Sequence, residues 1–257
     1  MVQESPPGMR ALERGLTVIR AFTESSEPLS LSEVARRTDL DRAVVRRVLG
    51  TLRALAYAEE TRAGWRLTPA VLELGYAYLS SDPRTEIAEA RLKPLADRTH
   101  ESCSLGVLHQ HRVVYLARVE VKRVVGPNLA IGSVLEPTLT SIGRLLLAYA
   151  DPDVVEDHLR STQLREATPH SITDPGELRD TLARVRHQGY CLVAEELELG
   201  LLALAVPVYG RDGRVVCGVN LTSHTTRMSP PQMVEEFLPL LQEIAEQLSQ
   251  DLRHAYL

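Results

Sequence analysis

The pattern of apolar and polar positions over residues 30–53 predicts two short helices joined by a tight turn. In the second helix, apolar residues recur at spacings that line one side of an α-helix: Val45, Val48, Leu52 and Leu55. Another side of the same helix carries arginines, namely Arg42, Arg46 and Arg53, with Arg47 beside them. A short helix that buries one stripe and exposes guanidinium groups has the geometry that enters a DNA major groove.

An arginine-rich helix face is usually only a solvated surface, so the neighbouring segments decide its interpretation. The preceding helix begins at Ser30 or Ser32, and Glu33 follows Ser30 at the spacing of a capping box. Its inward residues are expected to be Leu31, Val34 and Ala35. After a turn at residues 38–40, Asp41 is placed to cap the second helix.

Residues 56–67 then predict a small β-hairpin with its tip at residues 61–64. A helix-turn-helix followed by a hairpin is a winged helix, in which Arg62 and Arg66 on the wing reach phosphate or the minor groove. A first helix over residues 9–23 is expected to turn Leu12, Leu16 and Ile19 inward. We therefore interpret residues 9–68 as a DNA-binding domain.

The net charge of −5 is unusual for a DNA-binding protein until it is divided along the chain. Residues 1–69 hold 11 arginines and 9 acidic residues, whereas residues 70–257 hold 18 basic and 25 acidic residues. The basic part is therefore small and local, and the acidic remainder disfavours unspecific binding to nucleic acid.

A length of 257 residues suits one large domain or two ordinary ones. No apolar run approaches the roughly 18–20 residues of a membrane helix, and residues 1–10 lack the features of a signal peptide. The three cysteines show no metal or disulfide spacing. We expect a cytoplasmic protein that makes no membrane contact.

The remaining pattern predicts a tail, a linker and a second domain. Residues 1–8 are Pro-rich and expected to be disordered, and Thr68-Pro69 breaks the chain before a linker helix over 69–81. The apolar stripe of this helix, Leu72, Tyr76 and Leu79, either packs on its own domain or, as we prefer, pairs across a dimer. In residues 82–257, helices and antiparallel strands predict an α+β domain. Helices are expected at 83–99, 140–160, 174–188 and 230–252, and strands at 102–109, 112–119, 190–194, 201–209 and 214–223.

At this point the chain resembles the IclR family of bacterial transcriptional regulators over nearly its whole length. The resemblance rests on segments such as ALERGLTVIRAF, LSEVARRTDLDRAVVRRVLGTL, TSIGRLLLA and EELELGL. LTPAVLELGYAYLSS and ESCS are most similar to the branch that regulates catabolism of protocatechuate, 4-hydroxybenzoate and β-ketoadipate. The resemblance implies a GAF-like C-terminal effector-binding domain, a small organic acid as effector and operator DNA as partner. It also implies a dimer or a dimer of dimers, with no cofactor and no catalytic residues.

For the DNA-binding half, we expect Arg46 and Arg47 to approach base edges, since arginine to guanine is the commonest specific contact. Ser32, Arg42 and Thr51 are better placed for phosphates. The expected surface is completed by Arg53, Arg62 and Arg66. Gly50 is unexpected inside a helix, and close approach to either a neighbouring helix or the DNA backbone would explain it.

For the C-terminal half, the resemblance places an effector cup on the sheet. Its expected lining is Val124, Val125, Pro127, Ser141, Ile142, Gly143, Val193, Ala203, Asn220 and Thr222. N–H groups at the helix start near Ser141 suit a carboxylate. Asn220 and Thr222 alternate on one strand, so they either bind the ligand together or form an ordinary polar strand face. Cys103 and His100 either edge this cup or simply pack.

The cup departs from the aromatic-acid branch near residues 202 and 203, where leucine and alanine replace an expected arginine and serine. A more apolar wall makes a non-aromatic or uncharged metabolite the alternative effector. A less favoured alternative is an enzyme fused to a DNA-binding head. The chain has no Gly/Arg-rich adenylate loop, GxSxG, P-loop, GxGxxG or HExxH motif. His109 and His111 have no evident third ligand, so no metal is expected.

Overall fold

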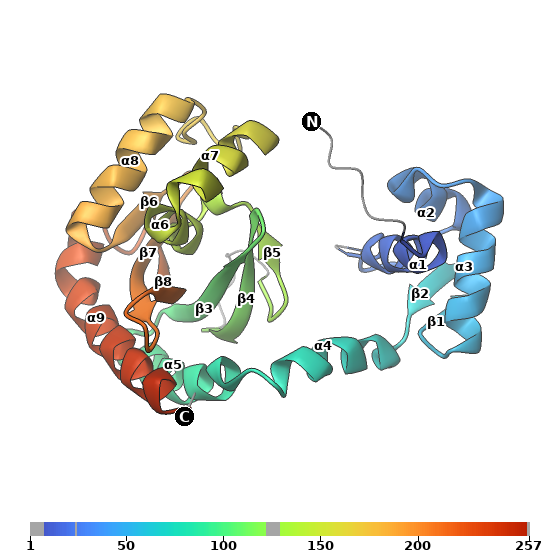
Figure 1. Cartoon of the computed structure of the whole chain (residues 1–257), viewed down its shortest axis with the longest axis horizontal. Helices are drawn as coiled ribbons and strands as arrows, with labels where there is room; N and C mark the ends of the chain where they lie inside the picture. Colours follow the sequence, from blue (N-terminus) through green and yellow to red (C-terminus); the bar gives the residue numbers. More distant parts are fainter. Residues whose placement is uncertain (1–7, 24, 122–128, 256–257) are drawn as a thin grey trace. The chain divides into compact units, whose positions relative to one another are not determined.

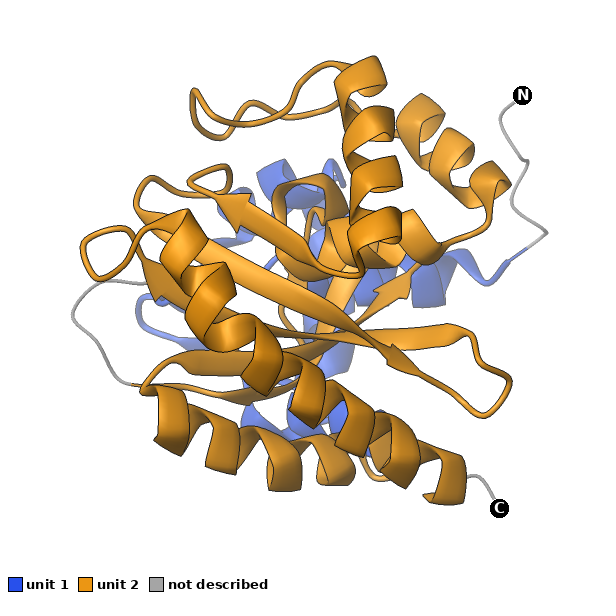
Figure 2. Ribbon diagram, turned by 90° about the vertical axis from the view of Figure 1, so that its left-hand side faces the viewer, with its two compact units in different colours: residues 1–78 blue, residues 79–257 orange. Residues whose placement is uncertain are grey.

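The structure is a computed structural model that describes residues 8–23, 25–121 and 129–255. The chain divides into two compact units, residues 1–78 and 79–257, which Figure 2 colours separately. Most of the expected N-terminal tail lies outside the described residues. None of the described helices combines the length and apolar composition that crossing a bilayer requires.

The first unit is a winged helix, as the sequence predicts. Three helices, α1 (Arg10–Arg20), α2 (Leu31–Thr38) and α3 (Arg42–Ala54), precede an antiparallel hairpin of β1 (Ala58–Thr61) and β2 (Gly64–Leu67). Leu29 adds a single bridge to the hairpin at Trp65. The core of the unit comes from all of these elements, with Val18, Leu29, Val34, Val45, Leu49, Leu52, Ala58 and Trp65 buried.

Two helix faces differ from their predictions. Leu12 and Leu16 of α1 are 60% and 41% exposed, and the fully buried residue of that helix is Val18. Leu12 and Leu16 therefore point away from the core of their own unit, whereas Ile19, the third residue of the predicted stripe, packs against that core. Leu55 is 60% exposed because α3 ends at Ala54, one residue before the predicted apolar stripe is complete.

The helix caps are partly as predicted. Ser30 caps α2, and its Oγ accepts a hydrogen bond of 3.1 Å from the Glu33 N–H. The Glu33 carboxylate pairs with Arg36 and Arg37 instead of returning to Ser30, and these two arginines lower its pKa to about 2. Asp41 occupies the N-cap position of α3 but makes no side-chain capping bond, so that part of the prediction is wrong.

The predicted linker helix is a short 3-10 turn (Pro69–Val71) followed by α4 (Leu72–Leu79). No residue of α4 is buried, and Leu72 and Tyr76 are 73% and 69% exposed, whereas Leu79 is partly buried. The boundary between the two units falls inside this helix.

The second unit is built on a six-stranded antiparallel sheet in the order β5-β4-β3-β8-β7-β6 (Figure 1). Its strands are β3 (Ser102–His109), β4 (Arg112–Val119), β5 (Val134–Leu135), β6 (Cys191–Ala194), β7 (Leu201–Tyr209) and β8 (Val215–His224). The sequence pattern predicts all of these except β5, which is too short to show a periodicity.

Helices cover both faces of this sheet. Helices α5 (Pro83–Thr99) and α9 (Pro230–Ala255) pack on one face, and α6 (Ser141–Tyr149) and α8 (Pro175–Gln188) pack on the other, with α7 (Pro152–Ser161) beside them (Figures 1 and 2). Alternate residues of the strands enter the two cores. Burial raises the pKa of each cysteine thiol to about 12, since Cys103 and Cys217 lie in one core and Cys191 in the other.

Candidate DNA-binding surface and effector pocket

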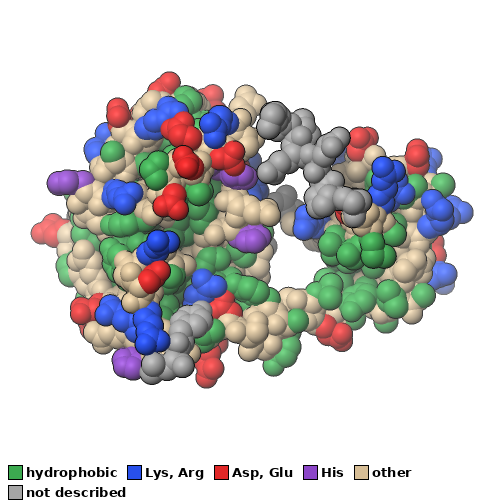
Figure 3. All heavy atoms as spheres, in the orientation of Figure 1, with side chains coloured by type: hydrophobic (Ala, Val, Ile, Leu, Met, Phe, Trp, Pro, Cys, Tyr) green, Lys and Arg blue, Asp and Glu red, His purple; other side chains and the backbone are tan. Residues whose placement is uncertain are grey.

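The outer side of α3 carries arginines with no protein partner. Arg42, Arg46 and Arg47 are exposed. Within the described part of the chain, no hydrogen bond or ion pair engages these three side chains. Figure 3 shows Lys and Arg side chains along the outer edge of this unit. Unpaired guanidinium groups on one helix can meet DNA without first breaking an internal ion pair.

The arginines near the wing are held differently. Arg53 lies 3.4 Å from a carboxylate oxygen of Glu60, and its guanidinium lies 5.8 Å from the centre of the Trp65 ring. Arg66 on β2 donates a hydrogen bond of 2.5 Å to Glu59. Only Arg62, exposed at the predicted hairpin tip, resembles the α3 arginines in having no partner among the described residues.

The predicted DNA-contacting residues do not all share one side of α3. Arg42, Arg46 and Arg53 are four and seven residues apart, a spacing that places them on the same side of the helix. Arg47 and Thr51 instead line a hollow of about 340 Å³ between α3 and α1. The Thr51 hydroxyl donates to the Arg47 carbonyl at 3.1 Å, and Ser32 lies exposed in the first turn of α2.

Gly50 faces open space. A Cβ built at this position would meet no described atom within 4 Å apart from its own helix and its chain neighbours. Close packing against another described helix of the chain therefore does not explain the glycine.

In the second unit, five of the predicted effector residues line one enclosed pocket. They are Ser141, Val193, Ala203, Asn220 and Thr222. Cross-strand pairing explains their convergence, because Ala203 on β7 lies opposite both Val193 on β6 and Thr222 on β8. The cavity volume is about 20 Å³, which is room for about one water molecule. A larger ligand must therefore displace part of the wall.

The rest of this wall was not predicted. It consists of Tyr115, Leu129, Leu139, Thr140, Leu197 and Leu201. Gly143 and Ile142 are buried but are not wall residues; a Cβ on Gly143 would overlap Pro137. The expected wall residues Val124, Val125 and Pro127 lie outside the described residues.

The polar groups of the pocket are only partly satisfied. Asn220 is 2% exposed, and its Nδ2 donates to Ser141 Oγ at 3.4 Å, while its Oδ1 has no hydrogen-bond partner among the described residues. At the start of α6, the Gly143 N–H already donates to Thr140 Oγ1 at 3.1 Å. The start of α6 therefore leaves the N–H groups of Ser141 and Ile142 without an acceptor within the helix.

A buried ion pair fixes the loop that carries Leu197. Arg144 on α6 is 1% exposed, and its Nη1 donates to Glu196 Oε1 at 2.6 Å. Its Nε donates to the Thr138 carbonyl at 2.7 Å. The Ile172 N–H donates to the same Glu196 carboxylate at 3.3 Å. The ion pair therefore connects α6 to the loop at residues 195–200, next to the pocket.

Three residues considered for the cup do not line the pocket. Leu202 is fully buried in the core under α5 and α9, so it faces away from the pocket, and of the two departing positions 202 and 203 only Ala203 lines it. Cys103 lies in that same core. His100 ends α5 with an exposed, left-handed backbone conformation, so neither residue edges the cavity.

His111 forms a pair that the sequence did not predict. Its ring centre lies 5.6 Å from that of His158 on α7, and its Nε2 lies 3.3 Å from Asp157. Burial is the main cause that lowers the pKa of His158, and His111 and Arg112 act in the same direction. Among the described residues, no group of three or more His, Cys, Asp or Glu side chains could hold a metal ion.

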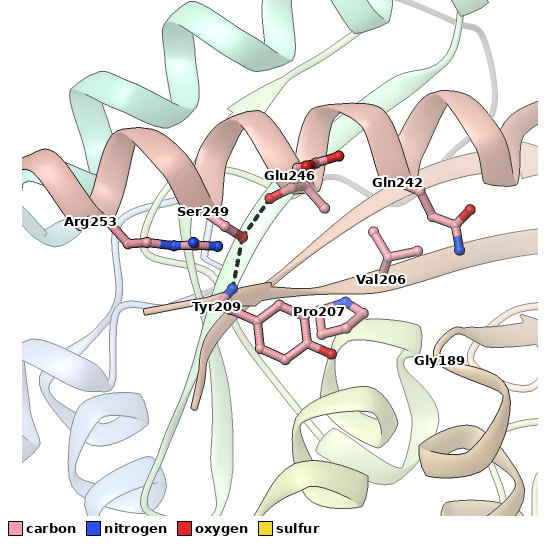
Figure 4. A pocket seen from close by; sticks show the side chains of 9 residues that line it. Gly189, Val206, Pro207, Tyr209, Gln242, Glu246, Ser249 and Arg253 are labelled. Carbon is pink, nitrogen blue, oxygen red and sulfur yellow. Dashed lines mark hydrogen bonds between the residues drawn. The ribbon is translucent and has the colours of Figure 1, made fainter. Parts of the chain in front are cut away.

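A second hollow, of about 350 Å³, lies between β7 and α9 (Figure 4). Its central hydroxyl is already satisfied, because Ser249 Oγ accepts from the Tyr209 N–H at 2.9 Å and donates to the Ala245 carbonyl at 2.6 Å. The pocket at Asn220 has an unpartnered polar atom and is the better candidate for a ligand site.

Comparison with known families agrees with both halves of this architecture. Residues 11–62 match the IclR helix-turn-helix domain, and residues 76–250 match the bacterial transcriptional regulator IclR C-terminal domain. The chain belongs to the IclR family. The resemblance of the motifs is thereby confirmed, and the relatives of this IclR-family chain are transcriptional regulators rather than enzymes.

Relatives of this IclR-family chain include regulators of aromatic catabolism. It is 37% identical to the Pca regulon regulatory protein of Pseudomonas putida, covering 96% of this chain and 85% of that protein. It is 35% identical to the p-hydroxybenzoate hydroxylase transcriptional activator of Acinetobacter baylyi, covering 92% of this chain and 89% of that protein. An IclR homologue from Microbacterium hydrocarbonoxydans, solved in complex with 4-hydroxybenzoate, matches with a TM-score of 0.80 and 25% identity, covering 95% of this chain and 99% of that one.

Proposed function

We propose that this regulator binds operator DNA through α3 and the wing, and that a small aromatic carboxylic acid bound at the Asn220 pocket controls it. The unpaired arginines of α3 support the DNA-binding surface. The observation that carries the effector site is the buried, unpartnered Asn220 Oδ1 at an enclosed pocket. The relatives named for Pca and p-hydroxybenzoate regulation support an aromatic acid as the ligand class.

In this proposal Arg46 and Arg47 read base edges, and Ser32, Arg42 and Thr51 contact phosphates. Arg62 at the wing tip reaches the flanking backbone. Phosphates reach Arg53 and Arg66 only in competition with Glu60 and Glu59, so these two arginines contribute less to affinity.

We further propose a cytoplasmic dimer, or a dimer of dimers, in which the exposed α4 stripe pairs between copies. A symmetric dimer reads a near-palindrome with half-sites about one helical turn apart. The effector shifts the relative placement of the two winged helices through the linker. It does so only if its affinity differs between the two arrangements.

The proposal is tested with a DNA site selected from a random duplex pool by the purified protein. Fluorescence anisotropy then compares Arg46→Ala with Arg20→Ala, which removes an exposed arginine from α1. Loss of one base-reading arginine weakens specific binding by roughly 5- to 150-fold, since such contacts are worth about 1–3 kcal/mol.

Titration calorimetry with 4-hydroxybenzoate and protocatechuate completes this test. Arg46→Ala should bind the acid like the parent protein, and Arg20→Ala should retain both activities. Unchanged site affinity in Arg46→Ala would show that the recognition helix is oriented differently. Absence of binding by both acids would direct the search to the non-aromatic or uncharged effectors that the Ala203 wall also permits.

A further inference from the structure

A row of polar side chains crosses three strands on the pocket face of the sheet. Ser104 on β3 lies opposite Arg118 on β4 and opposite Asn220 on β8. Side chains of directly opposed residues lie about 4.5–5.5 Å apart at their Cβ atoms. A register shift in the β3–β4 pair places Tyr115 opposite Gly106, so Arg118 and the pocket residue Tyr115 share this face.

Arg118 is buried, and no buried carboxylate among the described residues forms an ion pair with it. Its side chain is 6% exposed, and its Nη1 donates to Ser104 Oγ at 3.0 Å. The carboxylate that pairs with it, Glu120, lies 3.8 Å away and is 53% exposed. The Nε of Arg118 is buried and has no hydrogen-bond partner among the described residues. In contrast, the buried Arg144 is fully paired with Glu196.

Such an arrangement is unfavourable for the protein alone, because a buried cation and a buried amide oxygen each lose hydration without full compensation. The guanidinium of Arg118 requires an anionic acceptor, and Asn220 Oδ1 requires a donor. The two strands that carry them are separated by β3, which is roughly 9–10 Å of backbone spacing. A ligand with a carboxylate at one end and a hydroxyl at the other matches this pair of requirements.

We propose that Arg118 binds the carboxylate of the effector, that Ser104 positions its guanidinium, and that Asn220 Oδ1 accepts a hydrogen bond from a hydroxyl at the opposite end of the ligand. This assignment rests on the proposed function of the pocket and defines the ligand class within it. A hydroxy acid with a rigid ring between its two polar groups bridges the row, and a two-carbon acid is too short.

Calorimetry on the full chain tests this assignment with two probes, 4-hydroxybenzoate and the uncharged 4-hydroxybenzamide. The parent protein should prefer the acid by roughly 30-fold or more, as expected for a buried, hydrogen-bonded charge pair. Arg118→Met should reduce this preference to within about threefold while amide affinity stays within about threefold. The control is Arg112→Met on the same strand, since that side chain is 52% exposed, and it should keep the preference.

Arg118→Lys keeps the charge and provides a second variant should Arg118→Met fail to fold. It lacks Nε, so the acid should bind several-fold more weakly while the amide is unaffected. Unchanged acid preference in Arg118→Met, or unchanged acid affinity in Arg118→Lys, would overturn the role of Arg118 and leave the proposed function intact. If the parent protein binds none of 4-hydroxybenzoate, protocatechuate, phenylacetate and β-ketoadipate, the proposed function and this assignment both fail.

Discussion

At the scale of the residue, Gly50 is a poor helix former on the exposed side of the recognition helix α3. Helical spacing places it on the exposed side of α3 between Arg46 and Arg47, and no described neighbour restricts its side chain. A glycine there reduces helix stability, and nothing in the fold requires it. We attribute it to the close approach of a DNA backbone in the proposed complex.

Gly50→Ala separates the two effects. The substitution should stabilise the first unit by about 0.5–1 kcal/mol, because alanine restricts the unfolded chain and favours helix. It should weaken operator binding by roughly tenfold, equivalent to about 1.4 kcal/mol. Urea unfolding and anisotropy measure the two quantities. A variant that is more stable and binds DNA unchanged would rule out close backbone approach at this position.

His158 leads to a prediction about pH. Burial keeps its folded-state pKa below the ordinary value of 6.5, with His111 and Arg112 acting alike and Asp157 opposing them. As the pH falls below 6.5, the unfolded chain binds a proton at this histidine that the folded chain disfavours. The contribution of neutral His158 to the free energy of unfolding is therefore full above that pH and decreases below it. Urea unfolding at pH 7.5 and 5.5 should show a smaller loss for His158→Leu than for the parent.

The matched control is His170→Leu, since His170 is exposed. This variant should retain the acid sensitivity of the parent protein. Equal losses in the parent and in His158→Leu would assign the acid sensitivity to other groups.

At the scale of the element, α4 is too short and too exposed to be stable by itself. Isolated helices shorter than about 12–15 residues are marginal in water, and α4 spans Leu72–Leu79 with no buried residue. Apolar side chains gather along this segment on the face seen in Figure 3. Its conformation is explained if a second copy covers it.

Introduction of a charge at the stripe tests this pairing. Tyr76→Glu should shift the protein from dimer towards monomer, because it places a carboxylate within an apolar contact. Light scattering on a sizing column measures the change, with Glu89→Gln on the exposed side of α5 as the control. A Tyr76→Glu variant with the mass of the parent would exclude α4 as the dimer contact.

The elements also show what the sequence predicts well. Continuous apolar runs and turn residues predicted β3, β4, β7 and β8. The i, i+2 spacing of Asn220 and Thr222 predicted a shared strand face, and the family resemblance placed that face at the cup, where both residues lie. The role of Arg118 depends on a register shift between β3 and β4 that no spacing reveals. Its signal in the sequence is a lone charge near the end of an apolar strand. The partners Arg144 and Glu196 are 52 residues apart, so only the fold brings them together.

At the scale of the whole molecule, the two units must influence each other if the effector controls DNA binding. Thermodynamic linkage requires that effector and operator change each other's affinity by the same factor, typically about 5- to 150-fold. Anisotropy with and without 4-hydroxybenzoate gives one factor, and calorimetry with and without operator gives the other. If neither affinity changes, effector and operator bind independently of each other.

The three cysteines have a practical consequence. All are buried, and their thiols remain protonated far above neutral pH because their pKa values are about 12. Maleimide dyes react with exposed thiolates, so the native chain should be nearly inert to them at neutral pH. A single cysteine introduced on the surface of each unit would then accept fluorophores without removal of the native thiols, and energy transfer between the dyes would follow the effector's action in real time.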